Sequence, residues 1–206
     1  MTAPSTIQDP LEAARSEARG CAYHPRGTVH CVGTPMFRNQ LARDLACLLD
    51  LDPSVREWSC LPLVLRWTGD IHVPDFRVVR EQGTFLVDAV ASLDVNTKPW
   101  IEDEALRCGC IYERKAIGAD SALVRLANAR DILRYARWHC PLGDRLRLLA
   151  ALDEHGSLTV ADCLSAFLEV RPIAGLSSLI LHRFIEIDLD EARIGPETMI
   201  RRRRCD

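Results

Sequence analysis

A chain of 206 residues, with 48% hydrophobic and 27% charged residues, has the composition of a globular protein of one domain or two small ones. No apolar stretch approaches the roughly 20 residues of a membrane-spanning helix, and the N-terminal segment lacks the basic start and apolar core of a secretory signal, so we expect no membrane contact. The net charge of −3 excludes a uniformly basic surface, and nine cysteines without a regular framework predict reduced thiols in a cytoplasmic protein.

The first 33 residues are rich in Pro, Gly, Ser and Thr, and they predict a flexible arm with at most a short helix over residues 10–19. Cysteines and histidines gather in this arm without any common zinc-finger spacing, so we interpret them as chance neighbours: Cys21, His24, His30 and Cys31. A helix is expected next, with Thr34 and Pro35 as cap and first-turn proline and the segment DLDPS as its end. Its apolar residues recur at helical spacing, at Met36, Phe37, Leu41, Leu45, Leu48 and Leu49.

The following stretch changes to a period of two and predicts an antiparallel meander of short strands over residues 63–67, 71–79 and 84–92. Residues 98–119 suit a helix followed by a further strand, with Cys108 and Cys110 as buried thiols on one strand face. Residues 121–140 have the broad apolar face of a helix.

From residue 141 the texture changes to three short helical patterns, then FIEIDLD, a Gly-Pro turn and TMIRRRR, which is the order of a winged helix. The third pattern would be the recognition helix, and basic residues flank it at Arg171, His182 and Arg183. Its sequence PIAGLSSLIL is short of base-reading side chains, so a domain that docks on a protein remains open. The basic tail, Arg201, Arg202, Arg203 and Arg204, would lie along phosphates if it binds DNA.

One pair of acids carries candidate chemistry. Asp75 opens a predicted strand and Asp88 arrives on the returning one. Two carboxylates on adjacent strands suit Mg²⁺, which would polarise a phosphodiester and activate a water. A lysine two residues after the second acid would assist that water, but alternation sends Val90 to the face of Asp88.

The pieces LARDLACLLDLDPSVREW, LPLVLRW, IHVPDFRVV and FLVDAVAS are collinear with a known family. This block resembles the TnsA-type transposon endonucleases, a branch of the PD-(D/E)xK restriction-endonuclease-like nucleases. LANARDILRYAR is similar to the helix after that family's catalytic core, and the tail from residue 176 is similar to its C-terminal winged helix. The resemblance spans roughly residues 34–204. It implies an α/β fold with a restriction-endonuclease-like core, a mixed sheet flanked by helices, and a C-terminal winged-helix domain.

Carried over residue by residue, the family's catalytic positions fall on Ala42 for the helix acid, on Asp75 and Asp88, and on Val90 for the lysine. Neither alanine nor valine binds a cation or orients a water, so the pair is insufficient for ordinary cleavage and no cofactor is required. A residual site would take Mg²⁺ at Asp75 and Asp88. The residues that would have to replace the missing groups are Lys98, Lys115, Arg77, Glu102, Asp103 and Glu104, of which the last three suit a solvated helix start.

We therefore divide the chain into an arm (1–33), a restriction-endonuclease-like domain (34–140) and a winged-helix-like domain with a basic tail (141–206). The leading expectation is a catalytically degenerate TnsA-like protein of a bacterial mobile element, or a domesticated relative, that works through DNA and protein contacts. Two alternatives stay open. One is an active metal-dependent endonuclease subunit that uses Asp75 and Asp88, and the other is a regulator that binds only a protein partner.

Overall fold

The computed structural model describes residues 9–94, 98–118 and 120–203, which belong to two compact units. Unit 1 comprises Met1–Tyr23, His30–Leu45 and Ser54–Ile117, and unit 2 comprises His24–Val29, Ala46–Pro53 and Gly118–Asp206. The units meet in sequence near residue 118, and the domain boundary near residue 141 stays a prediction. No helix of the described residues is long and apolar enough to cross a bilayer.

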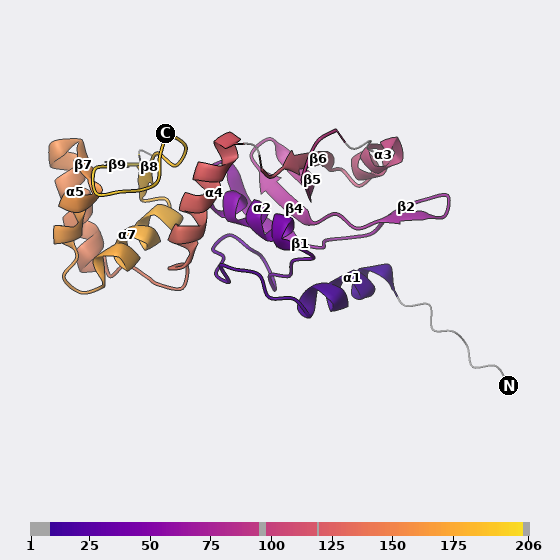
Figure 1. Cartoon of the computed structure of the whole chain (residues 1–206), viewed down its shortest axis with the longest axis horizontal. Coiled ribbons are helices and arrows are strands. Elements are labelled where there is room, and N and C mark those ends of the chain that lie inside the picture. The colour runs from indigo at the N-terminus through magenta and orange to yellow at the C-terminus, as the bar shows by residue number, and fades with distance from the viewer. Residues whose placement is uncertain (1–8, 95–97, 119, 204–206) are drawn as a thin grey trace. The chain divides into compact units, whose positions relative to one another are not determined.

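Unit 1 is built on a four-stranded mixed sheet of order β1-β4-β5-β6 (Figure 1). Strands β1 (Val55–Cys60), β4 (Phe76–Arg80) and β5 (Gly83–Val90) form an antiparallel meander. Strand β6 (Ile111–Ala116) follows helix α3 (Pro99–Arg107) and pairs in parallel with β5. A parallel return needs such a crossover. The expected α/β class with a mixed sheet flanked by helices is confirmed.

Apolar side chains cover both faces of this sheet, because neighbouring strand residues point to opposite sides. On one face the rings of Trp58 and Phe76 pack edge to face with centroids 5.5 Å apart, and Phe37 joins them. On the other face Leu86 packs with Ile101 and Ala105 of α3. Asp88 therefore lies on the α3 side of the sheet, two residues beyond Leu86 on the same strand face.

Several observed elements differ from the predicted ones, and the helix predicted over residues 121–140 ends at Leu133. The strand predicted over residues 71–79 is divided: its start pairs with β2 (Leu65–Trp67) as β3 (Asp70–His72) in a separate hairpin, and its end is β4. The first strand of the meander is β1 instead of β2. Helix α2 (Gln40–Leu51) starts after Asn39, whose side chain accepts the Ala42 N–H at 2.8 Å, rather than at a Thr34 cap. The predicted strand after α3 is present as β6, but both cysteines precede it, and Cys108 is exposed rather than buried, whereas Cys110 is buried.

The described part of the segment predicted to be a flexible arm contacts the rest of unit 1. It contains helix α1 (Pro10–Arg19), and Arg15 donates to the Leu61 carbonyl at 3.1 Å. Backbone hydrogen bonds join residues 30 and 32 to Trp58, with Val32 N–H donating at 2.7 Å and His30 O accepting at 3.0 Å. These bonds cover the outer edge of β1.

Unit 2 combines helices with a three-stranded sheet of order β7-β9-β8 (Figure 1). Its helices are α4 (Asp120–Leu133), α5 (Leu142–His155), α6 (Val160–Cys163), the 3-10 turn η1 (Leu164–Ala166) and α7 (Pro172–Leu181). The strands are β7 (Ser157–Thr159), β8 (Ile185–Ile187) and β9 (Met199–Arg202), all antiparallel to their neighbours. The predicted two-stranded ribbon is present as β8 and β9, with β7 as an additional strand.

A buried carboxylate organises the turn before α7. Asp144, in the first turn of α5, is fully buried and accepts the N–H groups of residues 168, 169 and 170 at 2.9–3.1 Å, together with a hydrogen bond from Arg147. Burial by itself raises the pKa of a carboxyl group, but these donors hold the pKa of Asp144 below its ordinary value. The connection between η1 and α7 is thereby fastened to α5.

Candidate functional site

Asp75 and Asp88 lie side by side in unit 1, as the sequence predicts. Asp75 is the residue before β4, Asp88 is in β5, and their exposed fractions are 4% and 6%. The Asp75 N–H donates to Asp88 Oδ1 at 2.9 Å, and the Ala89 N–H donates to Asp75 Oδ2 at 3.0 Å. Each carboxylate is thus bound by the backbone of the other strand, which fixes both side chains where the two strands meet.

A guanidinium group occupies the position between the two carboxylates. Arg38 donates to Asp75 Oδ1 from Nε at 2.9 Å and from Nη2 at 2.6 Å, and the same Nη2 lies 3.7 Å from Asp88 Oδ1. Arg38 comes from the segment just before α2, and 29% of its side chain is exposed. A fixed positive charge from within the chain therefore offsets part of the negative charge of this acid pair.

Two further donors satisfy the remaining oxygen of the pair. His72 Nε2 lies 2.6 Å from Asp88 Oδ2, and the Tyr112 hydroxyl donates to the same oxygen at 2.5 Å. Their rings meet at right angles with centroids 6.1 Å apart. All four carboxylate oxygens consequently have protein donors. We call Arg38, His72, Asp75, Asp88 and Tyr112 the acid-pair cluster.

The environment of the cluster shifts the pKa values of the two acids in opposite directions. Burial, opposed by Arg38 and assisted by the charge of Asp88, raises the pKa of Asp75. Burial also acts on Asp88, but the hydrogen bonds from His72, Tyr112 and the Asp75 N–H outweigh it and lower the pKa of Asp88. Burial and the Asp88 charge raise the pKa of Tyr112, so its hydroxyl keeps its proton and remains a donor.

A divalent cation does not fit this arrangement. Mg²⁺ requires free carboxylate oxygens and several waters, whereas the oxygens here accept hydrogen bonds and the Arg38 guanidinium takes the cation's place. Among the residues that the structure describes, no group of three or more His, Cys, Asp or Glu side chains is arranged to hold a metal ion. The acid-pair cluster is a hydrogen-bond network in which protein donors satisfy both carboxyl groups and Arg38 supplies one positive charge.

The two positions that depart from the family pattern lie in ordinary packing. Ala42 is buried in α2, and Val90 is the half-buried last residue of β5, whose carbonyl accepts the Ile117 N–H at 2.9 Å. Neither side chain can donate a hydrogen bond or ligate a metal.

The residues considered as replacements point to other partners. Lys98 Nζ lies 3.2 Å from Asp70 Oδ2, and Lys115 Nζ lies 3.4 Å from Glu113 Oε2. Lys115 is opposite Ala89 in the parallel register, so it is on the sheet face away from Asp88. Arg77 lies 3.9 Å from a carboxylate oxygen of Glu57. At the start of α3, Glu102 and Asp103 are exposed, and Glu104 pairs with Arg107.

Within the described residues, the cysteine and histidine side chains of the arm do not form a metal-binding group. Cys21, His30 and Cys31 belong to unit 1, whereas His24 belongs to unit 2. Cys31 makes a backbone bridge to Trp58. Eight cysteines within the described residues form no disulfide: Cys21, Cys31, Cys47, Cys60, Cys108, Cys110, Cys140 and Cys163.

In unit 2 the expected recognition helix is a core element. Residues Ala174 to Leu181 of α7 are all buried, so this helix has no face to insert into a DNA groove. Arg171 precedes it and is exposed, and His182 follows it with its ring stacked on His139 at a centroid distance of 5.8 Å. Arg183 donates to the Asp52 carbonyl at 3.0 Å.

The basic residues Arg201, Arg202 and Arg203 lie in β9 or directly after it. Arg201 is opposite Glu186 in the register, Arg202 pairs with Asp153, and the Arg203 N–H donates to the Phe184 carbonyl at 3.2 Å. Arg204 lies outside the described residues. An ion pair therefore engages the Arg202 side chain, whereas no salt bridge within the described residues involves the guanidinium group of Arg201 or Arg203, so the tail as a phosphate contact stays a prediction.

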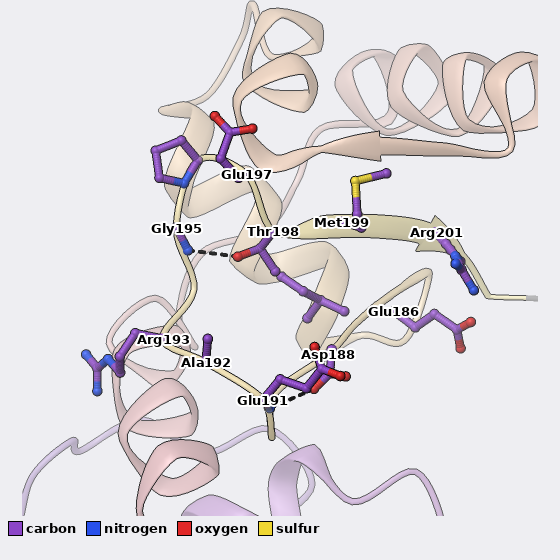
Figure 2. A pocket seen from close by; sticks show the side chains of 12 residues that line it. Glu186, Asp188, Glu191, Ala192, Arg193, Gly195, Glu197, Thr198, Met199 and Arg201 are labelled. Atoms are coloured by element: carbon purple, nitrogen blue, oxygen red, sulfur yellow. Dashed lines mark hydrogen bonds between the residues drawn. The ribbon is translucent and has the colours of Figure 1, made fainter.

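The loop between β8 and β9 surrounds a cavity of about 800 Å³ (Figure 2). Its charged lining residues are Glu186, Asp188, Glu191, Arg193, Glu197 and Arg201, so carboxylates outnumber guanidinium groups. Arg193 pairs with Asp131 of α4. This negative balance disfavours a phosphate backbone at the position where a wing would contact DNA.

One buried side chain holds this loop on α4. Asn128 donates to the carbonyls of Leu189 and Ala192 at 3.0 and 2.8 Å and accepts the Ile194 N–H at 3.1 Å. Arg125 adds an ion pair with Asp190 at 2.8 Å. Residues 189–194 of the loop are consequently held against helix α4.

Comparison of the sequence with protein-family models and with curated proteins found no match.

Proposed function

We propose that this chain is a TnsA-like protein that has lost nuclease chemistry and works by binding DNA. The order of elements in unit 1 supports the fold part of the proposal. A helix, an antiparallel meander, a crossover helix and a parallel strand produce the mixed sheet that the sequence resemblance implies, with Asp75 and Asp88 at adjacent strands. In unit 2, helices followed by a small antiparallel sheet are consistent with a winged helix.

The observation that carries the proposal is the Arg38 guanidinium between Asp75 and Asp88. In an active metal-dependent nuclease this position belongs to the cation that polarises phosphate. An arginine supplies charge but neither an open coordination position nor a proton acceptor. The acid pair then has a structural role at the junction of β4 and β5. The function that we propose is binding to the DNA of a bacterial mobile element, or of a domesticated descendant.

The test compares cleavage and binding in the same preparation. Supercoiled plasmid is incubated with Mg²⁺ or Mn²⁺ and the wild type or Asp75→Ala, and binding to linear DNA is measured by gel shift at low salt. We expect equal background nicking and a salt-sensitive shift by the wild type. Metal-dependent nicking above the level of Asp75→Ala would overturn the loss of chemistry, and absence of any shift would overturn DNA binding.

Truncation is a poor way to test the basic tail. Removing residues 201–206 also removes Arg201 and Arg202 from β9, which is the central strand of its sheet. Point substitutions keep the backbone hydrogen bonds of β9, so Arg201→Gln is the cleaner variant for the tail.

A protein-binding regulator is the second candidate, and the cavity of the β8–β9 loop favours it. Its carboxylate-rich lining, with the exposed side chain of Met199 beside it, suits a basic protein segment better than DNA. A wild-type protein that fails to shift DNA at low salt would support this candidate.

A further inference from the structure

A second cavity of unit 2, of about 350 Å³, lies between the start of α5 and the end of α7. We call it the histidine–arginine cavity, and its lining residues are His139, Cys140, Arg145, Ser178, Leu179, His182 and Phe184. None of these residues is acidic, in contrast to the cavity of the β8–β9 loop. Its volume is near the lower end of the range of about 300–1,000 Å³ for small-molecule sites.

Arg145 supplies the positive charge of this cavity, because burial and the neighbouring His139 lower the pKa of His182. Within the described part of the chain, no carboxylate forms an ion pair with Arg145, His139 or His182. Other arginines of unit 2 do pair with acids, as Arg125 does with Asp190 and Arg147 with Asp144. An unpaired guanidinium beside two imidazole rings is a natural receptor for an anion.

Aromatic and imidazole rings lie next to the Arg145 guanidinium group. The Arg145 guanidinium carbon lies 4.6 Å from the centroid of the Phe184 ring, and the His139 and His182 rings are stacked with an interplanar angle of 29°. Phe184 and His182 are exposed, and Trp138, the neighbour of His139 in sequence, has 42% of its surface exposed. A guanidinium cation and accessible ring faces together are the features that bind unpaired bases and their phosphates.

Single-stranded DNA fits these features better than a duplex does. A duplex offers a regular row of phosphates and keeps its base faces stacked inside, so the rings of Phe184 and His182 would have nothing to stack on. A hollow of this volume accepts one phosphate with an adjoining base. An acidic peptide would satisfy Arg145 but would leave the exposed rings unused.

We propose that the histidine–arginine cavity binds one phosphate and an adjoining base of single-stranded DNA. Arg145 and His182 contact the phosphate, and Phe184 stacks on the base. This inference rests on the proposed DNA-binding function and specifies the form of the DNA and the residues that hold it. It replaces α7 and the β8–β9 loop as the contact region of unit 2.

The test uses fluorescence anisotropy with one labelled oligonucleotide, alone or annealed to its complement. The full-length variant Arg145→Gln/His182→Gln is compared with Arg66→Gln/His155→Gln, which removes the same residue types at exposed positions outside the cavity. We expect the wild type to prefer the single strand. The cavity variant should bind it about tenfold more weakly, with a salt slope reduced by about one, and the control should match the wild type.

Each contrary result has a distinct meaning. Equal binding by the cavity variant and the wild type overturns this site and leaves the proposed function intact. A wild type that prefers the duplex overturns the single-strand inference alone. A wild type that binds neither form at low salt overturns both proposals. If circular dichroism shows that the double variant is unfolded, Arg145→Gln alone decides, because that side chain is partly exposed and pairs with no carboxylate.

Discussion

Replacing Arg38 by methionine should lower the free energy of unfolding, because two buried carboxyl groups then lack their guanidinium partner. Methionine keeps most of the apolar stem but removes the charge and the bonds of 2.9 and 2.6 Å to Asp75. Removing one partner of a buried ion pair costs roughly 3–5 kcal/mol, because the other charge stays buried. Since Arg38 is 29% exposed and water screens part of the interaction, we expect a loss near the lower end, about 3 kcal/mol.

The pH dependence of this loss is a sharper test than its size. Burial raises the pKa of Asp75, Arg38 opposes it, and Asp88 adds to it, so the variant raises this pKa further. A carboxyl group with a raised folded-state pKa binds more protons in the folded protein, so stability falls as pH rises through that pKa. The loss should therefore be about 3 kcal/mol at about pH 8 and smaller at about pH 5.

Urea unfolding followed by tryptophan fluorescence provides the measurement, because Trp58 is buried in the same unit. Arg77→Met is the matched control. Arg77 is 43% exposed and 3.9 Å from Glu57, so its removal should change the free energy of unfolding by no more than about 0.5 kcal/mol. The reasoning fails if Arg38→Met behaves like this control, or if its loss of stability is larger at the lower pH.

Three further results are expected. Asp144→Asn should lose about 2 kcal/mol in urea unfolding, because an amide presents N–H groups to the backbone donors of residues 168–170; an unchanged midpoint would contradict this. Tyr112→Phe should lose about 1.5 kcal/mol, since it removes the hydroxyl donor to Asp88, and a neutral result would mean that water replaces it. Millimolar Mn²⁺ should leave the wild-type melting temperature unchanged in differential scanning fluorimetry, and a rise of about 2 °C or more would show a cation bound to the folded protein.

The sequence predicts the acid pair but not its partners, for a physical reason. Asp75 and Asp88 belong to one hairpin, so the alternation of side chains along its strands and its short turn are enough to predict that they lie together. Arg38 reaches Asp75 from a segment without regular structure, 37 residues away, and Tyr112 reaches Asp88 across 24 residues. No local period marks such contacts, and only the pairing of β5 with β6 brings Tyr112 near.

The missed strands have different causes. In β1 the register shifts between Val55 and Glu57, so two exposed residues separate the buried Val55 and Trp58 and the period of two is broken. Strand β7 has three residues and pairs with β9, some forty positions later in the chain, so nothing near it in sequence indicates a strand. The longer helices α4 and α5 begin where the sequence pattern predicts, although α4 ends at Leu133 instead of residue 140.

The hydrogen bonds of Asn128 to the β8–β9 loop affect which substitutions this surface can accept during evolution. The amide touches only main-chain atoms, the carbonyls of Leu189 and Ala192 and the N–H of Ile194. Every residue type except proline offers those same atoms. The three bonds of Asn128 therefore tolerate substitutions at the loop residues they reach, so the charge of this surface can change by mutation while these backbone contacts with α4 persist.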